Sequence, residues 1–144
     1  MLPNEIADGE TIVRAVKTPY HEKNGKLVPA AFRPAPDTNK LSVMRQRIGN
    51  DACKAAAVKV CGNNYFGLAT LLAGRIREIG PQLEDAPDEY EGHAHICYDF
   101  VLKRNVPATP EQQKFFADLA KHADLHVDGA PGSPGWTGKD LARS

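Results

Sequence analysis

The sequence lacks a cysteine framework. It contains three cysteines in 144 residues, and no two of them form a Cys-x-x-Cys pair. An odd number without that spacing argues against a disulfide-stapled scaffold and a cysteine-based zinc knuckle. Cys53 and Cys61 lie in a helical pattern that separates them by about 12 Å, too far for a disulfide. Free thiols, as in a cytoplasmic protein, are therefore expected.

The chain also lacks an excess of charge of either sign and any long apolar run. Eighteen basic residues balance eighteen acidic ones, so no overall field attracts a polyanion, and nucleic-acid binding is disfavoured. No apolar run approaches the roughly 20 residues that span a bilayer, and no basic start followed by an apolar stretch resembles an export signal. These absences predict a cytoplasmic protein without membrane contact, and the small size and simple composition suggest a prokaryotic one.

What the sequence does contain is typical of a globular fold, with 42% hydrophobic and 25% charged residues. The β-branched segment Thr11–Lys17 predicts a strand, and residues 26–32 predict a second one. Asn24 and Gly25 between them favour a type I′ turn, which would make a hairpin. Pro29 would confine the second strand to an edge or a bulge.

Two helices are indicated most clearly. Residues 51–61 are alanine-rich and apolar around most of the helix, with Asn50 or Asp51 as N-cap and Gly62 as the stop, so this helix should be largely buried. Thr109, followed by Pro and then by Gln at the third position, predicts a capping box for a helix that continues to residue 125. Shorter segments complete the pattern: strands at 41–45, 65–72 and 91–102, helical turns at 73–79 and an acidic loop at 84–91.

This order of elements predicts an α+β fold in which a mainly antiparallel sheet packs against two main helices. We assign residues 1–127 to a single globular domain. Residues 128–144 contain four glycines and two prolines without a periodic apolar face, which predicts an extended or partly disordered tail. The only tryptophan, Trp136, lies in this tail and would anchor it either on the protein's own core or on a protein partner.

A ladder of polar side chains runs through the strand at 91–102. His93, His95, Cys97 and Asp99 alternate with apolar residues and would share one face, about 6.6 to 6.8 Å apart along the backbone. The two histidines could bind a divalent transition metal, or serve as acid and base while Asp99 orients a ring. Cys97 could be activated by His95. Alternatively, the ladder is simply the polar face of an amphipathic strand.

Further candidates lie elsewhere in the chain. Arg33, Ser42 and Arg45 could form a clamp for a phosphate or carboxylate, because a guanidinium binds such groups through two parallel hydrogen bonds. His122 and His126 have the spacing of a helical metal site but are better explained as structural residues. No phosphate-binding glycine loop and no dinucleotide motif is present.

Two functional hypotheses follow. The neutral charge and the lack of a complete catalytic motif favour a small soluble binding or accessory protein that contacts a protein partner through its loops or through the tail with Trp136. The alternative is a small hydrolase or group-transfer enzyme that acts on an anionic small molecule with His93 and His95, oriented by Asp99. No cofactor is firmly implied, and the oligomeric state and substrate are not defined by the sequence.

Overall fold

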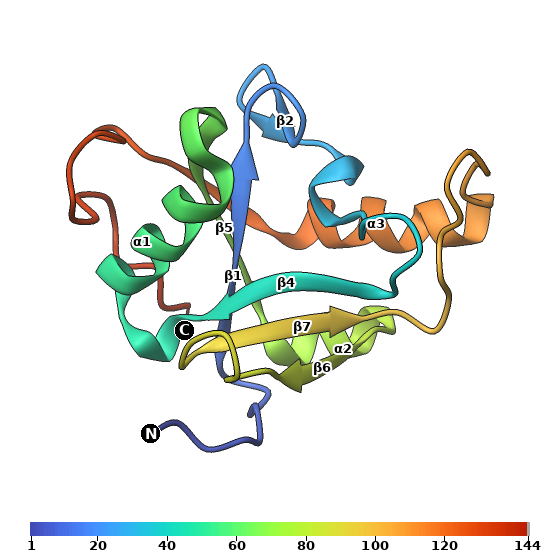
Figure 1. Ribbon diagram of the computed structural model, residues 1–144, viewed down its shortest axis with the longest axis horizontal. Coiled ribbons are helices and arrows are strands. Elements are labelled where there is room, and N and C mark those ends of the chain that lie inside the picture. Colours follow the sequence, from blue (N-terminus) through green and yellow to red (C-terminus); the bar gives the residue numbers. More distant parts are fainter. Residues whose placement is uncertain (144) are drawn as a thin grey trace.

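The computed structural model describes residues 1–143 and is built on a six-stranded sheet with the order β6-β7-β4-β1-β5-β8, in which every pairing is antiparallel (Figure 1). The strands are β1 (Thr11–Lys17), β2 (Glu22–Lys23), β3 (Lys26–Leu27), β4 (Lys40–Arg45), β5 (Tyr65–Leu72), β6 (Gln82–Asp85), β7 (His93–Cys97) and β8 (Asp124–Val127). The helices are α1 (Asn50–Cys61), α2 (Ala73–Ile79) and α3 (Pro110–His122), with 3-10 turns η1 (Pro29–Phe32), η2 (Gln46–Ile48) and η3 (Gly62–Asn64). The predicted α+β class with a mainly antiparallel sheet is confirmed.

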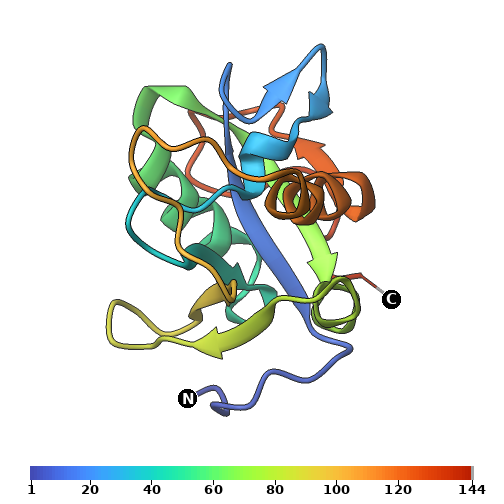
Figure 2. The same ribbon diagram turned by 90° about the vertical axis from the view of Figure 1, so that its right-hand side faces the viewer.

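Helices cover both faces of the sheet rather than one (Figure 2). Helix α1 packs on one face, while α2, α3 and η1 pack on the other. We call the two resulting cores the α1-side core and the α3-side core. The α1-side core includes Val13, Ala15, Met44, Cys53, Ala57 and Leu68. The α3-side core includes Ile12, Val16, Leu41, Ile96, Phe116 and Leu119.

Helix α1 turns one side toward the sheet. Cys53, Ala57 and Cys61 recur every four residues and are buried against it. Outside this stripe, Ala52, Ala55 and Val60 are exposed. The prediction of a largely buried helix is therefore only partly correct, because the helix is apolar on a side that no other segment of residues 1–143 buries.

The C-terminal tail packs against α1, so its predicted flexibility is not confirmed. Leu141 is buried in the α1-side core, and the backbone N–H of Trp136 donates to Asp51 in the first turn of α1 at 2.8 Å. The buried Lys54 amine donates to the carbonyls of Ala130 and Gly135 at 2.8 and 2.9 Å. The tail has no helix or strand up to residue 143, yet these contacts hold it on the surface of α1 (Figure 1).

The N-terminal hairpin is shorter than predicted. Asn24 and Gly25 do adopt positive φ angles of 55° and 78°, as a type I′ turn requires, but they join only the two-residue strands β2 and β3. Pro29 begins η1 instead of continuing a strand, because its fixed φ and missing N–H suit the first turn of a helix. β1 therefore pairs with β4 and β5.

The capping box of α3 is present as predicted. The Gln112 N–H donates to the Thr109 hydroxyl at 3.2 Å, and the Thr109 N–H donates to the Gln112 side chain at 2.9 Å. The helix ends at His122, earlier than expected, because the following residues pair with β5 as strand β8. Across residues 1–143, no helix combines the length and apolar character needed to cross a membrane.

Replacing Thr109 with alanine should lower the free energy of unfolding by about 1 kcal/mol, because the Gln112 N–H loses its acceptor at the helix start. Urea denaturation followed by circular dichroism measures this change. Thr109→Ser keeps the hydroxyl and serves as the matched control. Equal losses for the two variants would show that the capping hydrogen bond contributes nothing.

Candidate functional site

A polar face covers the part of the sheet that lies beyond α1. Register places Ser42 of β4 opposite His95 of β7, and Glu84 of β6 lies opposite His95 on the other side. Two residues further along β7, Cys97 is flanked by Lys40 of β4 and Gln82 of β6. Ser42, Lys40 and Glu84 are all exposed. We call this surface the polar face; it consists of Lys40, Ser42, Gln82, Glu84, His93, His95 and Cys97.

The closest contact on the polar face joins a serine and a histidine. The Ser42 hydroxyl lies 2.7 Å from Nε2 of His93, and Nδ1 of the same ring lies 3.1 Å from the carbonyl oxygen of Ala86. A carbonyl can only accept a hydrogen bond, so we assign the ring proton to Nδ1. Nε2 is then free to accept from the hydroxyl of Ser42. A contact of this kind is one that a serine nucleophile and a general base require.

The loop between β6 and β7 shields this histidine from solvent. The His93 side chain is only 2% exposed. The Tyr90 ring lies 5.1 Å from the His93 ring, and Glu89 approaches Nε2 to 3.8 Å. Ser42, in contrast, is exposed. The hydroxyl is therefore accessible to a small molecule, while the ring behind it is fixed in position.

A second histidine stands beside the first. The rings of His93 and His95 meet edge to face, with 4.8 Å between their centroids. Nδ1 of His95 lies 3.4 Å from a Glu84 oxygen, which also accepts from Lys40 at 2.9 Å. The Lys40 hydrogen bond, together with that of His95, lowers the pKa of the Glu84 carboxyl. A row of charged and titratable groups therefore borders the serine and histidine.

The structure gives little support to a metal at this ladder. Among residues 1–143, no group of three or more histidine, cysteine or acidic side chains has the arrangement needed to hold a metal ion. Both ring nitrogens of His93 already have hydrogen-bond partners. His126 lies on β8, where its ring contacts Thr70 at 3.0 Å, so His122 and His126 do not share a helical face.

Within the described residues, Asp99 and Cys97, the other two members of the predicted ladder, form no hydrogen bond with Ser42 or His93. Asp99 follows the end of β7 and lines a cavity of about 290 Å³ with Gly80 and Phe115. Within residues 1–143 it forms no hydrogen bond with His93 or His95. Burial raises the pKa of the Cys97 thiol, which opposes formation of the nucleophilic thiolate.

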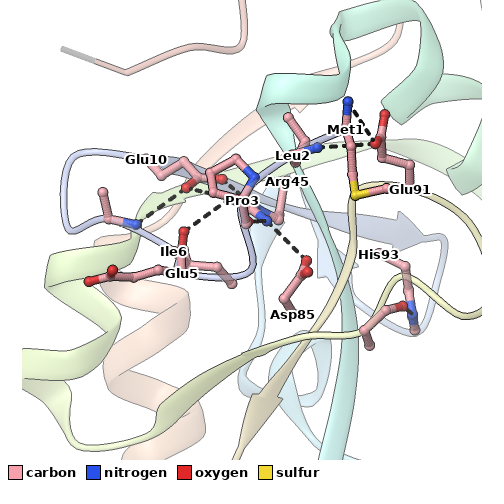
Figure 3. Close-up of polar contacts among 12 residues, drawn as sticks. Met1, Leu2, Pro3, Glu5, Ile6, Glu10, Arg45, Asp85, Glu91 and His93 are labelled. Atoms are coloured by element: carbon pink, nitrogen blue, oxygen red, sulfur yellow. Dashed lines mark hydrogen bonds and ion pairs between the residues drawn. The ribbon is translucent and has the colours of Figure 1, made fainter.

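The three residues of the expected anion clamp have different environments. Arg33 is exposed near the loop at 102–107, and Ser42 contacts His93. Arg45 is fully buried, and its guanidinium donates to Glu10 at 2.9 Å, to Asp85 at 3.0 Å and to a backbone carbonyl of the N-terminal segment (Figure 3). The chain therefore uses Arg45 to fasten its first ten residues to the sheet.

Several members of the site were not recognised in the sequence. The Ala86 carbonyl and Glu89 belong to a loop whose path no sequence motif specifies, and Glu84 was expected in that loop rather than on β6. The only sequence signal for this site was the polar residue at every second position of the segments that form β4 and β7. Comparisons with known protein families, with curated proteins and with solved structures found no match.

Proposed function

We propose that the protein is a small hydrolase in which Ser42 is the nucleophile and His93 the general base. The observation that carries this proposal is the 2.7 Å contact between the Ser42 hydroxyl and Nε2 of His93, whose other nitrogen is held by the Ala86 carbonyl. In hydrolytic enzymes a serine needs such a base, because its hydroxyl is a weak nucleophile at neutral pH.

The reaction uses an ester as substrate. Nε2 of His93 takes the hydroxyl proton as the Ser42 oxygen attacks the carbonyl carbon, and the same proton then passes to the departing alcohol. Water attacks the acyl-serine in the second step, and His93 takes a proton from this water. The acyl group then leaves as a carboxylic acid, while His93 returns the proton to the Ser42 oxygen. The Ala86 carbonyl stabilises the positively charged ring in both steps by accepting its Nδ1–H.

Lys40, a neighbour of Ser42, suits a substrate with a negative charge. His95 lies opposite Ser42 in register, but its Nδ1 faces Glu84 at 3.4 Å. Lys40 is two residues along the same strand, and its side chain is 45% exposed. Lys40 can donate a hydrogen bond to a carboxylate on the substrate, although it must share its amine with Glu84.

The other functional hypothesis, binding of a protein partner through the tail, has less support. The tail packs on α1, where the backbone of Trp136 is bonded to Asp51 and its indole N–H donates to the Lys139 carbonyl at 2.7 Å. Such contacts favour a role for Trp136 in holding the protein's own chain.

The proposed nucleophile can be tested with a fluorophosphonate probe, which forms a stable bond to activated serines. Intact-mass spectrometry should show one adduct, and peptide mapping should locate it on Ser42. Ser42→Ala should lose the adduct. His93→Gln should react with the probe at least about 100-fold more slowly than the wild type, because a general base contributes a rate factor of this size.

Ser133→Ala is the matched control, because Ser133 is an exposed serine in the tail, and this variant should label at the wild-type rate. Circular dichroism and thermal melting of each variant check that the fold is retained. An unlabelled wild-type protein, or equal labelling of wild type and Ser42→Ala, would refute the proposal.

A further inference from the structure

An apolar groove follows the outer side of α1. Five residues of this helix form one wall, and the loop between β6 and β7 contributes Tyr90 to the other, around a volume of about 1000 Å³. The residues from α1 are Ala52, Ala55, Ala56, Lys59 and Val60. From this groove and its charges we infer that two copies of the chain form a homodimer through α1.

The outer side of α1 carries apolar side chains, whereas the solvent-facing side of a surface helix is normally polar. Val60 is 60% exposed, and Ala52 and Ala55 are exposed as well. The opposite side of α1 is already buried against the sheet, so the helix has two apolar sides. An exposed, contiguous apolar surface of this kind typically marks a contact with another protein.

Charged residues lie at opposite ends of the groove. Lys59 lies near the C-terminal end of α1, and it has no ion-pair partner among residues 1–143. Glu89 lies at the other end, because its loop is fastened beside the start of α1. There, the Gly92 carbonyl accepts from the Arg45 N–H at 2.7 Å, and Gly92 packs against Ile48.

A two-fold axis between two copies would bring opposite charges of the two grooves together. When two α1 helices pack antiparallel, Lys59 of each copy lies beside Glu89 of the other, and the ion pair forms twice. Arg47, which precedes α1, lines the groove at the same end as Glu89, and Glu91 in the facing loop offsets its positive charge there. A parallel arrangement would place Lys59 against Lys59.

The side chains of the groove also allow two helices to approach closely. Ala52, Ala55 and Ala56 recur at intervals of three and four residues, so they form a stripe without bulky groups. Val60 at the end of the stripe supplies apolar area to bury against the alanines of the other copy. The inference concerns assembly and does not require Ser42 to be a nucleophile, although Glu89 also lies 3.8 Å from Nε2 of His93.

Sedimentation velocity and light scattering across a range of concentrations test this inference. The wild-type protein should approach twice the monomer mass of 15.7 kDa as its concentration rises. Ala55→Arg places a long charged side chain in the middle of the interface and should leave only monomer. Ala117→Arg introduces the same change at an exposed position of α3 and should dimerise like the wild type.

Charge reversal tests the antiparallel arrangement. Lys59→Glu and Glu89→Lys should each weaken dimerisation by about tenfold, because each substitution places two pairs of like charges in contact. The double variant Lys59→Glu with Glu89→Lys should recover wild-type affinity. A wild type that stays monomeric, or a dimer that Ala55→Arg leaves unchanged, overturns the inference. Failure of the double variant to recover overturns the antiparallel arrangement.

Discussion

Arg45→Met is expected to lower the free energy of unfolding by about 3–5 kcal/mol, because it leaves two carboxylates without the cation that compensates them. Glu10 and Asp85 both contact the Arg45 guanidinium, and their side chains are only 4% and 7% exposed. The substitution also removes the donors to the carbonyls of Pro3 and Glu5, so the N-terminal segment loses its attachment to the sheet. Urea denaturation measures the loss.

Arg75→Met provides the control for this prediction. Arg75 forms an ion pair with Glu78 on α2, and both side chains are at least half exposed, so its removal should change stability by less than about 1 kcal/mol. Adding Glu10→Gln and Asp85→Asn to Arg45→Met should recover part of the loss, because the uncompensated charges are then gone. A small loss for Arg45→Met alone would contradict the structural role of Arg45.

Removal of residues 129–144 should lower the free energy of unfolding by about 3 kcal/mol or more. Burial of one leucine side chain contributes about 2 to 5 kcal/mol when measured by substitution to alanine, and Leu141 is 1% exposed. Lys54 also loses the two carbonyls that accept from its amine and keeps only Asp128 at 3.0 Å. A buried ammonium group with unsatisfied donors is unfavourable.

Thermal melting of the shortened chain measures this effect. Leu141→Ala should account for about 2 kcal/mol or more of the loss, while Val106→Ala, at a position that is 55% exposed, should be nearly neutral. An unchanged melting temperature after the truncation would show that the tail does not contribute to the fold. Trp136 would then be available for a partner, as the sequence allowed.

Features that depend on neighbouring residues could be predicted from the sequence. The capping box of α3 involves residues three apart, and the turn at Asn24 and Gly25 depends on local φ angles. The polar face of β7 follows from its alternation. In each case the chemistry that determines the structure lies within a few residues, so the pattern can be recognised in one sequence.

Features that depend on distant residues could not be predicted. Ser42 and His93 are 51 residues apart, and they meet only because β4 pairs with β7, which the order of strands in the sequence does not specify. Arg45 was expected in an anion clamp, because its two carboxylate partners are 35 and 40 residues away in the sequence. Glycine and proline in the tail indicated flexibility, whereas the buried Lys54 holds the tail by donating hydrogen bonds to two of its carbonyls.

Strand β1 connects the two cores. Ile12 and Val16 are buried on the α3 side, while Val13 and Ala15 are buried on the α1 side. The strand also lies between β4 and β5 in the middle of the sheet. Neither layer of helices can separate from the sheet without exposing one set of these side chains. The two layers should therefore unfold in one cooperative transition, and the slowest amide hydrogen exchange should occur in β1 and β5.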